Sequence, residues 1–210
     1  MRIAITGSTG FIGRHLTEAL LKRGDVVLIV GRDNRVVECD RIYHLACPST
    51  NDAIHNRPTE VVDTILDVTR TIIQRYPNTL IVNASSMGAA TVSGAGSIDP
   101  SPQDAYNVAK LCMETYLEYS GAHYINYRIP SVYGPGMADD AFIKRCVDGN
   151  AYRPFERNRL HYIAHIDDVV QSLIELKPIV SETITLGDIY EQFTSGRRGL
   201  HRPTPRPPFA

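Results

Sequence analysis

The sequence has almost no net charge and no long hydrophobic run. Its 210 residues include 22 basic and 23 acidic side chains, for a formal net charge of −1. That balance gives no electrostatic case for binding nucleic acid or a membrane surface. No apolar stretch is long enough to cross a bilayer, and the first residues have the pattern of a strand rather than of a signal peptide. We therefore expect a cytoplasmic globular protein with neither a nucleic-acid nor a membrane partner.

Cysteine is scarce and is not arranged for disulfides or a metal. The four cysteines are Cys39, Cys47, Cys112 and Cys146, and none belongs to a CxxC pair. We interpret them as reduced thiols. The seven histidines show no HExxH or other paired-ligand pattern. We expect no metal site.

The chain does contain a glycine-rich turn near its N-terminal end. Residues 3–6 form an apolar run typical of a buried strand, and Gly7, Gly10 and Gly13 follow before a helical pattern. Glycines permit a sharp turn and a close approach to a pyrophosphate. The start of the helix would direct free N–H groups at that phosphate. The alternative is an ordinary strand–helix turn, but the strand before and the helix after favour a dinucleotide site.

The turn after the second predicted strand, residues 26–30, bears on the choice of cofactor. An acidic residue there would accept from the 2′-hydroxyl of NAD, whereas an arginine would pair with the 2′-phosphate of NADP. Gly31 stands where the acid would be and Arg32 follows it, which favours NADP over NAD. Two alternatives stay open: Arg32 as a solvated turn residue, and Asp33 serving NAD one position later.

Strands and helices alternate along the rest of the chain, which indicates an α/β fold with a doubly wound parallel sheet of the Rossmann type. Further strands are expected at residues 36–38, 41–45, 79–83, 122–128 and 183–186, and helices at 60–76, 104–119, 139–148 and 167–176. Loops are expected at 88–102, 130–136 and 150–160. The segment 33–40 is too short for the crossover helix that parallel strands need.

The same pattern predicts three parts. Residues 1–134 form a dinucleotide-binding domain, residues 135–200 a small substrate lobe, and residues 201–210 a proline-rich tail. Within the lobe, the helix at 167–176 and the strand at 183–186 are expected to return to the Rossmann core.

A tyrosine and a lysine on one predicted helix are the candidate acid–base residues. Tyr106 and Lys110 are four residues apart, so they share a helix face. A phenol has an ordinary pKa near 10, and a neighbouring ammonium lowers the pKa of a phenol. Ser86 ends the preceding strand, where open α/β sheets bind ligands. Because a Tyr-x-x-x-Lys pair is common by chance on helix surfaces, the glycine turn and Ser86 carry much of this hypothesis.

These pieces resemble the extended short-chain dehydrogenase/reductases, the NAD-dependent epimerase/dehydratase group. The matching segments, in the order of the family, are GSTGFIG (7–13), YHLA (43–46), ASS (84–86), YNVAK (106–110), RIPSVYGPG (128–136) and HIDDV (165–169). The resemblance implies that Tyr106 is the general acid/base, that Lys110 binds the nicotinamide ribose and lowers the pKa of the tyrosine, and that Ser86 completes the triad.

The resemblance also implies the cofactor contacts and a homodimer. The residues implied to line the pyrophosphate are Gly7, Gly10, Phe11, Ile12 and Gly13. Those implied to flank the nicotinamide are Ala46 and the segment from Pro130 to Val132. Two copies would pair through the helices at 60–76 and 104–119.

The sequence departs from the family pattern at positions that bear on the substrate. The chain is shorter than is usual in the family. Ser131 replaces an asparagine that often contacts substrate, and His161 stands where an arginine commonly contacts the nucleotide diphosphate. Met87 and Gly88 follow Ser86 where dehydratases carry an acid pair. The sequence therefore lacks the acid and base that water elimination needs, and it predicts a reaction that consists of hydride transfer only.

Three functions are consistent with these observations. The first is NAD(P)-dependent hydride transfer on a nucleotide sugar, either C4-type epimerisation or keto-sugar reduction. The second is NADPH-dependent reduction of a small carbonyl compound, which the Gly31-Arg32-Asp33 turn slightly favours. The third is a non-catalytic NADP-binding regulatory or scaffold protein, against which the intact Ser86, Tyr106 and Lys110 argue.

Overall fold

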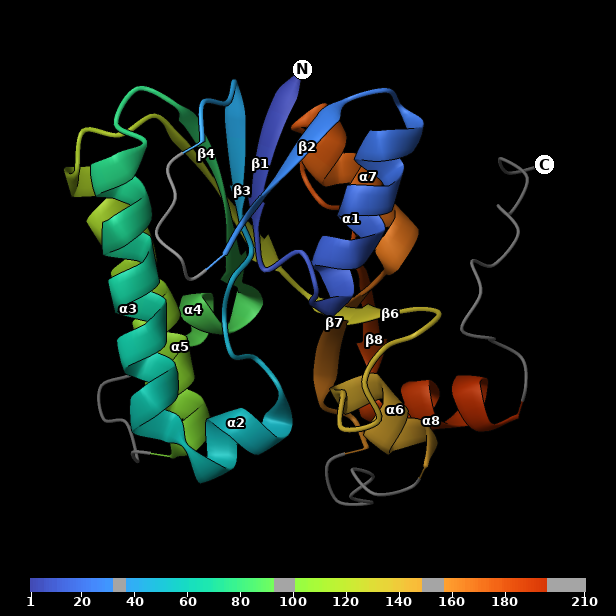
Figure 1. Ribbon diagram of the computed structural model, residues 1–210. Coiled ribbons are helices and arrows are strands. Elements are labelled where there is room, and N and C mark those ends of the chain that lie inside the picture. Colours follow the sequence, from blue (N-terminus) through green and yellow to red (C-terminus); the bar gives the residue numbers. More distant parts are fainter. Residues whose placement is uncertain (32–36, 93–100, 149–156, 196–210) are drawn as a thin grey trace.

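The computed structural model describes residues 1–31, 37–92, 101–148 and 157–195, and within them two sheets (Figure 1). The larger sheet has five parallel strands in the order β2-β1-β3-β4-β5. The strands are β1 (Arg2–Thr6), β2 (Val26–Val30), β3 (Arg41–His44), β4 (Leu80–Ser86) and β5 (Tyr124–Ile129). From β1 the chain adds β2 on one side and the later strands on the other. The expected doubly wound parallel sheet is confirmed.

Helices cover both faces of this sheet (Figure 1). One face carries α1 (Phe11–Lys22) and α7 (Ile166–Glu175), and the other carries α3 (Pro58–Arg75) and α5 (Pro102–Tyr119). The main core lies under α1 and α7, with Ile5, Leu16 and Leu173 fully buried. The expected helix at 167–176 therefore packs on the Rossmann sheet. Each helix presents one apolar stripe to the strands, which is what buries it.

The second lobe lies beyond the carboxyl ends of the parallel strands (Figure 1). Its elements are β6 (Ser131–Tyr133), α6 (Phe142–Val147), β7 (Leu160–His165), β8 (Glu182–Thr185) and α8 (Leu186–Thr194). Tyr133, Ile143 and Ile189 are buried in its own core. Phe11, at the start of α1, packs against this core and against the main one. The start of α1 thus lies where the two lobes meet.

The strand expected at 183–186 does not return to the Rossmann sheet. It forms β8, which pairs antiparallel with β7 in the three-stranded sheet β6-β7-β8. In β8 Ile184 is buried while its neighbours are exposed or half-buried. That alternation suits a strand with one covered face, not the doubly covered strand of a parallel sheet.

The expected strand at 36–38 is also wrong for its described part, because Val37 and Glu38 are not in a strand. Side chains bind their backbone instead. The hydroxyl of Tyr76 accepts from Val37 N at 3.3 Å, and Arg2 Nε donates to Glu38 O at 3.2 Å. Val36 lies outside the described residues.

Several short elements fall where loops were expected. β6 lies inside 130–136, β7 begins at the end of 150–160, and α4 (Met87–Val92) covers the start of 88–102. The helices α2 (Asn51–Asn56) and α8 were not expected. Each of these elements is too short for its hydrophobic periodicity to distinguish a helix or strand from a loop. Tertiary packing stabilises them instead.

A buried polar group joins α5 to the ends of β4 and β5. Glu114, on α5, accepts a hydrogen bond from the buried hydroxyl of Ser85 and two from Arg128 Nε and Nη2, the latter at 2.7 Å. This pairing raises the pKa of Arg128. The contacts fix the helix that carries Tyr106 and Lys110 against the sheet.

Replacing Glu114 by Ala is expected to lower the free energy of unfolding by about 1–3 kcal/mol, because the hydroxyl of Ser85 loses its buried acceptor. Urea unfolding measures the change. Glu114→Gln keeps an acceptor oxygen and is expected to lose less. Equal losses for the two variants would contradict this account of the contact.

Candidate functional site

The site lies at the carboxyl ends of β1 and β3. The chain leaves β1 to form β2 on one side of it and then crosses to form β3 on the other side, so the strand order changes direction between β1 and β3. In open α/β sheets this reversal opens a crevice at the carboxyl ends of the strands, and ligands bind there. The glycine turn follows β1 on one side of the crevice, and Leu45 and Ala46 follow β3 on the other.

Two of the glycines are required by close backbone approaches. Gly7 has φ +69°, and a Cβ there would lie 2.7 Å from Ala46 N. A Cβ on Gly13 would lie 2.0 Å from Gly7 O. At Gly10, by contrast, a Cβ would have one neighbour within 4 Å, Gly7 O at 3.3 Å. The turn is thus packed tightly against β3 and α1, but open beside Gly10, where a phosphate can approach the backbone.

The start of α1 suits an anion. Its N-cap is Gly10, no side chain caps the helix, and no acidic residue stands in its first turn. The free N–H groups and the positive end of the helix dipole are therefore available to a phosphate. Phe11 and Ile12 are half-buried and pack on the main core, which holds this first turn in place. These residues fit the pyrophosphate of a dinucleotide.

Ser86, Tyr106 and Lys110, here named the Ser-Tyr-Lys group, come together at the end of β4. The hydroxyl of Ser86 lies near the phenol of Tyr106 and lowers the pKa of that phenol in part. Lys110 Nζ donates to Ala84 O at 2.8 Å and lies 5.8 Å from the centroid of the Tyr106 ring. The oxygen of Ser86 also accepts from Gly88 N at 3.1 Å. The group stands within the carboxyl-end crevice.

The start of α5 sets where Tyr106 and Lys110 lie. Ser101 is its N-cap, and the Ser101 hydroxyl accepts from Asp104 N at 3.2 Å while the Asp104 carboxylate accepts from Ser101 N at 3.2 Å. Pro102 occupies the first turn, where its missing N–H costs nothing. This reciprocal capping fixes the helix at its first residue.

The phenol of Tyr106 is shifted in the direction opposite to the one expected. Burial raises the pKa of Tyr106, the thiol of Cys47 raises it further, and the hydrogen bond from Ser86 lowers it in part. The ammonium of Lys110 donates to Ala84 O and lies over the Tyr106 ring. Without a bound dinucleotide, burial therefore favours the protonated form of Tyr106.

We expect the phenol of Tyr106 to remain protonated at pH 10, where an ordinary tyrosine is half ionised, because burial raises its pKa. The absorbance change of phenolate formation, measured for the wild type and for Tyr106→Phe without added nucleotide, checks this. The two curves should coincide up to pH 10. If the wild type forms one more phenolate below pH 10 than Tyr106→Phe does, the raised pKa of Tyr106 is contradicted.

Cys47 is a member of the site that the sequence did not indicate. Its thiol donates to Pro48 O at 3.7 Å, and its side chain packs on the same buried cluster as Tyr106. Burial raises the pKa of this thiol, while the nearby Lys110 and Tyr106 lower it in part. The only sequence signal was its position directly after YHLA. Cys47 thus lies against the Ser-Tyr-Lys group as a neutral thiol.

The segments expected to flank the nicotinamide lie at the same edge of the sheet. Ala46 N donates to Thr6 Oγ1 at 3.1 Å, beside the glycine turn. Ser86 is paired with Ile129, so Pro130 follows directly beside the end of β4. Val132 lies in β6, and its side chain packs on the main core.

Besides Ser86, the two residues expected to contact substrate lie on adjacent strands of the smaller sheet. Ser131 begins β6 and is paired with Ile163 of β7, at the boundary between the lobes. His161 lies two residues before Ile163, inside the lobe, where its ring stacks on Phe142 with centroids 4.5 Å apart. Arg32, on which the NADP prediction depends, lies outside the described residues.

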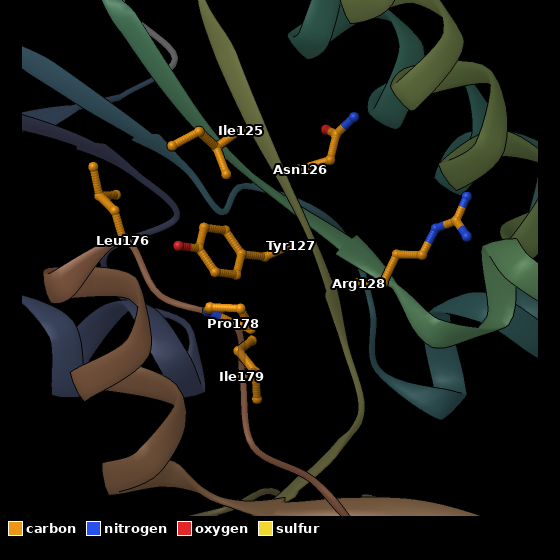
Figure 2. Close-up of a pocket in the computed structure, with 7 residues that line it drawn as sticks. All are labelled: Ile125, Asn126, Tyr127, Arg128, Leu176, Pro178 and Ile179. Atoms are coloured by element: carbon orange, nitrogen blue, oxygen red, sulfur yellow. The ribbon is translucent and has the colours of Figure 1, made fainter.

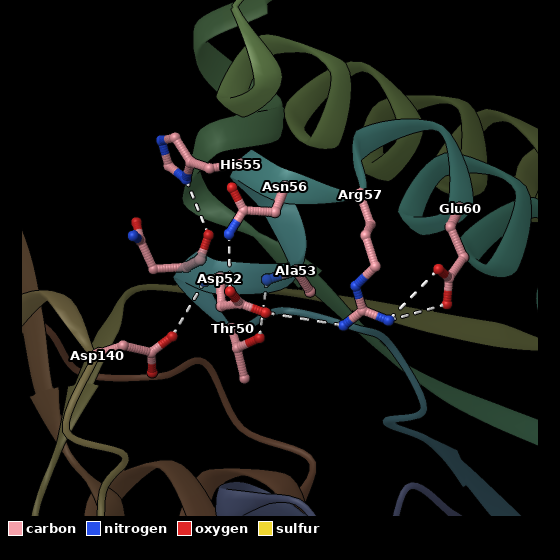
Figure 3. A network of polar contacts seen from close by, with 9 residues as sticks. Thr50, Asp52, Ala53, His55, Asn56, Arg57, Glu60 and Asp140 are labelled. Carbon is pink, nitrogen blue, oxygen red and sulfur yellow. Dashed lines mark hydrogen bonds and ion pairs between the residues drawn. The ribbon is translucent and has the colours of Figure 1, made fainter.

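A contact joins the two lobes across the open side of this region (Figure 3). The carboxylate of Asp140, between β6 and α6, accepts from Asp52 N in the first turn of α2 at 3.2 Å. Thr50 caps the same helix by accepting from Ala53 N at 3.2 Å. Arg57 pairs with Glu60 at 3.2 Å. The short helix α2 therefore packs against α3 and α5 and also contacts the segment between β6 and α6.

A separate cavity of about 330 Å³ lies along β5 and does not contain the Ser-Tyr-Lys group. Figure 2 shows Ile125 and Tyr127 facing the segment that carries Pro178, while Arg128 points away from it. Its lining residues are Ile125, Asn126, Tyr127, Arg128, Leu176, Pro178 and Ile179. This cavity lies beside β5, the edge strand of the large sheet, and is separate from the crevice at the carboxyl ends of the strands.

The described residues hold no cluster of three or more His, Cys, Asp or Glu side chains that could bind a metal ion. None of the helices in the described part of the chain is both long and apolar enough to cross a membrane.

The parallel sheet and the glycine turn are typical of dinucleotide-binding proteins, and a family model matches most of the chain. Residues 3–174 match the NAD dependent epimerase/dehydratase family. The chain belongs to this family.

The curated proteins that this chain resembles include UDP-glucuronic acid decarboxylases. UDP-glucuronic acid decarboxylase 1 of Arabidopsis thaliana is 24% identical over 235 residues, covering 84% of this chain and 52% of that protein. UDP-glucuronic acid decarboxylase 6 of the same plant is 26% identical over 227 residues, covering 84% and 66%. The chain thus spans about half to two thirds of these relatives.

Among solved structures, UDP-glucose 4-epimerase of Thermotoga maritima superimposes with a TM-score of 0.72 at 19% identity, covering 99% of this chain and 87% of that one. The Thermus thermophilus UDP-glucose 4-epimerase, solved with NAD, gives 0.67 at 18% identity, covering 93% and 83%. At these identities the likeness shows the shared fold.

Proposed function

We propose that this chain binds a nicotinamide dinucleotide and catalyses reversible hydride transfer at a carbinol carbon of a nucleotide sugar. The observation that carries the proposal is the position of the Ser-Tyr-Lys group in the same crevice as the open glycine turn. A bound nicotinamide supplies the hydride acceptor and donor. The chain's own residues bind the substrate hydroxyl and move its proton.

Each residue of the group has a distinct role in this proposal. As a phenolate, Tyr106 takes the proton of the substrate hydroxyl during oxidation, and it returns this proton during reduction. The positive charges of Lys110 and of an oxidised nicotinamide would favour the phenolate, against the burial that raises the pKa of Tyr106 in the chain without a dinucleotide. Ser86, whose hydroxyl lies near that phenol, holds the substrate oxygen beside it. Lys110 is 4% exposed, so its ammonium acts in a site of low dielectric, where it stabilises the phenolate that oxidation requires. It also holds the nicotinamide ribose.

The sugar carbon acted on is proposed to be C4. Relatives named UDP-glucose 4-epimerase and UDP-glucuronic acid decarboxylase support a 4-keto sugar as the shared product of oxidation. Because Met87 and Gly88 follow Ser86, the position offers no acid or base for water elimination. C4 epimerisation or keto-sugar reduction is the leading reaction. Decarboxylation is the second candidate, because a 4-ketone lies β to the carboxylate of a glucuronosyl group and activates its loss.

Product analysis tests the proposal. The protein is incubated with NAD and, separately, UDP-glucose, UDP-galactose, UDP-N-acetylglucosamine and UDP-glucuronic acid, and the products are resolved by chromatography and mass. Conversion of one sugar nucleotide, absent in Tyr106→Phe, is expected. Turnover of simple ketones with NADPH, but of no sugar nucleotide, would instead establish the small-carbonyl reductase. Dinucleotide binding without any turnover would establish the non-catalytic binding protein.

The family description and the solved complexes support NAD, whereas Arg32 favours NADP. We expect Arg32→Ala to weaken NADPH binding about tenfold or more while leaving NADH binding unchanged, because a guanidinium–phosphate pair is a strong charge-assisted hydrogen bond. Paired titrations with NADH and NADPH measure this. Equal effects on both would assign Arg32 to a solvated turn and leave NAD as the cofactor.

A homodimer through α3 and α5 remains part of the proposal. Tyr116 and Tyr119 of α5 are 49% and 82% exposed, and aromatic side chains are enriched at interfaces. Sedimentation of the wild type should give a dimer that Tyr116→Glu with Tyr119→Glu converts to a monomer. A wild-type monomer would contradict the homodimer.

A further inference from the structure

A row of polar residues crosses the sheet beneath α3 and α5. Thr6, His44, Asn83 and Asn126 occupy adjacent register positions in β1, β3, β4 and β5. Thr6, His44 and Asn83 are 3% exposed or less. Most buried polar groups in proteins are hydrogen-bonded. Both ring nitrogens of His44 have a hydroxyl partner, Thr6 on one side and Thr69 on the other.

The hydrogen bonds of His44 settle which of its ring nitrogens carries the proton. Thr69, on α3, donates its hydroxyl proton to Ile65 O at 2.7 Å. The oxygen of Thr69 is then left to accept, and His44 Nε2 lies 3.0 Å from it. Nε2 therefore carries the proton, and Nδ1 is the acceptor.

The chain of bonds continues from the other side of the ring. The hydroxyl of Thr6 lies 3.1 Å from His44 Nδ1 and donates to it. The oxygen of Thr6 accepts from Leu45 N and Ala46 N, each at 3.1 Å. Every hydrogen bond thus points the same way, from the amides after β3, through Thr6 and His44, to α3.

The amides at the start of this chain belong to the segment that meets the site. Ala46 is the backbone against which Gly7 is packed. Cys47, the next residue, contacts Tyr106 and Lys110. A shift of residues 45–47 would therefore move Ala46, which packs against Gly7, together with Cys47, which lies beside the phenol of Tyr106.

We propose that His44 is a positioning residue for the site, which acts as a neutral imidazole protonated at Nε2 and fixes the segment 45–47 through Thr6. The inference rests on the proposed function only in that the fixed segment lines the dinucleotide crevice. Neutrality has an electrostatic reason as well. Burial and the positive charge of Lys110 lower the pKa of His44 to about 3, so the ring adds no positive charge beside that ammonium.

Variants of Thr69 test the proposal at a distance from the crevice. Thr69→Val keeps the shape of the side chain but removes the acceptor for Nε2–H, whereas Thr69→Ser keeps the hydroxyl. Thr69→Val should weaken NADH binding roughly tenfold, and Thr69→Ser should restore wild-type affinity. Tyr43→Phe is the matched control, because Tyr43 is the neighbour of His44 on β3, is fully buried, and its hydroxyl donates to Leu173 O on the other face at 3.1 Å.

Loss of stability without loss of affinity in Thr69→Val, as in Tyr43→Phe, would overturn the positioning role. Two measurements on the chain without nucleotide keep the inference separate from the proposed function. Nitrogen-15 spectra of the histidine rings should show His44 neutral and protonated at Nε2 at pH 5, and a ring protonated at Nδ1 or charged would overturn it. The amide of Ala46 should exchange faster in Thr69→Val than in Tyr43→Phe, and equal exchange would also overturn it. If the wild type binds neither dinucleotide, the proposed function fails, and these two measurements alone decide the role of His44.

Discussion

Replacing Tyr106 by Phe is expected to reduce turnover about 10²–10⁴-fold, because the substrate proton then has no acid or base to carry it. The variant removes one oxygen and keeps the ring. The packing of Tyr106 against the buried cluster that contains Ala53, Val61 and Met113 is thus retained. Dinucleotide affinity and thermal stability should stay near their wild-type values. The measurement is the initial rate with the active sugar nucleotide, together with an NADH titration.

A matched control lies on the same helix. Tyr116 is 49% exposed and stands outside the crevice, so Tyr116→Phe should leave both rate and affinity unchanged. A Tyr106→Phe variant that retains full activity would remove the phenol from the mechanism. A variant that loses dinucleotide binding in proportion to its rate would assign Tyr106 to cofactor binding instead.

Replacing Gly13 by Ala is expected to destabilise the fold by about 3 kcal/mol, the upper end for overpacking a well-packed region. The added Cβ would lie 2.0 Å from Gly7 O and 2.8 Å from Ser8 Cα. Both are backbone atoms, so no side chain can move aside. For a chain of this length the melting temperature should fall by about 6–12 °C, and NADH binding should be lost with the geometry of the turn.

Gly10→Ala separates the shape of the turn from the space beside it. Gly10 has ordinary extended angles, with φ −71° and ψ 172°, and its Cβ would meet one atom at 3.3 Å. The variant should keep nearly the wild-type melting temperature but bind NADH roughly tenfold more weakly, because the methyl group would occupy the side open to phosphate. Unchanged binding in Gly10→Ala would place the dinucleotide elsewhere.

The parts of the fold that the sequence predicted are those set by local chemistry. The run of residues 3–6, the three glycines and the apolar stripe of α1 carry their own strand, turn and helix signals. The i, i+4 spacing of Tyr106 and Lys110 likewise predicted a shared helix face, on which both lie. Each of these depends on neighbours within a few residues.

The parts that failed depend on partners far along the chain. The pKa of Tyr106 is raised by burial and by Cys47, which follows a different strand. The strand at 182–185 is held by β7, whose own sequence carried no clear strand signal. The pairing of His44 with Thr69 needs the strand register and the packing of α3 at once. A polar residue at the end of an apolar strand, such as Thr6 or His44, was the one local hint.

The most direct test of the account is a titration of the purified wild-type chain with NADH and with NADPH, followed by the nicotinamide fluorescence. The account predicts saturable binding of at least one of them, weakened in Gly10→Ala and abolished in Gly13→Ala. Failure of the wild type to bind either dinucleotide would contradict the assignment of the crevice between β1 and β3 as a cofactor site.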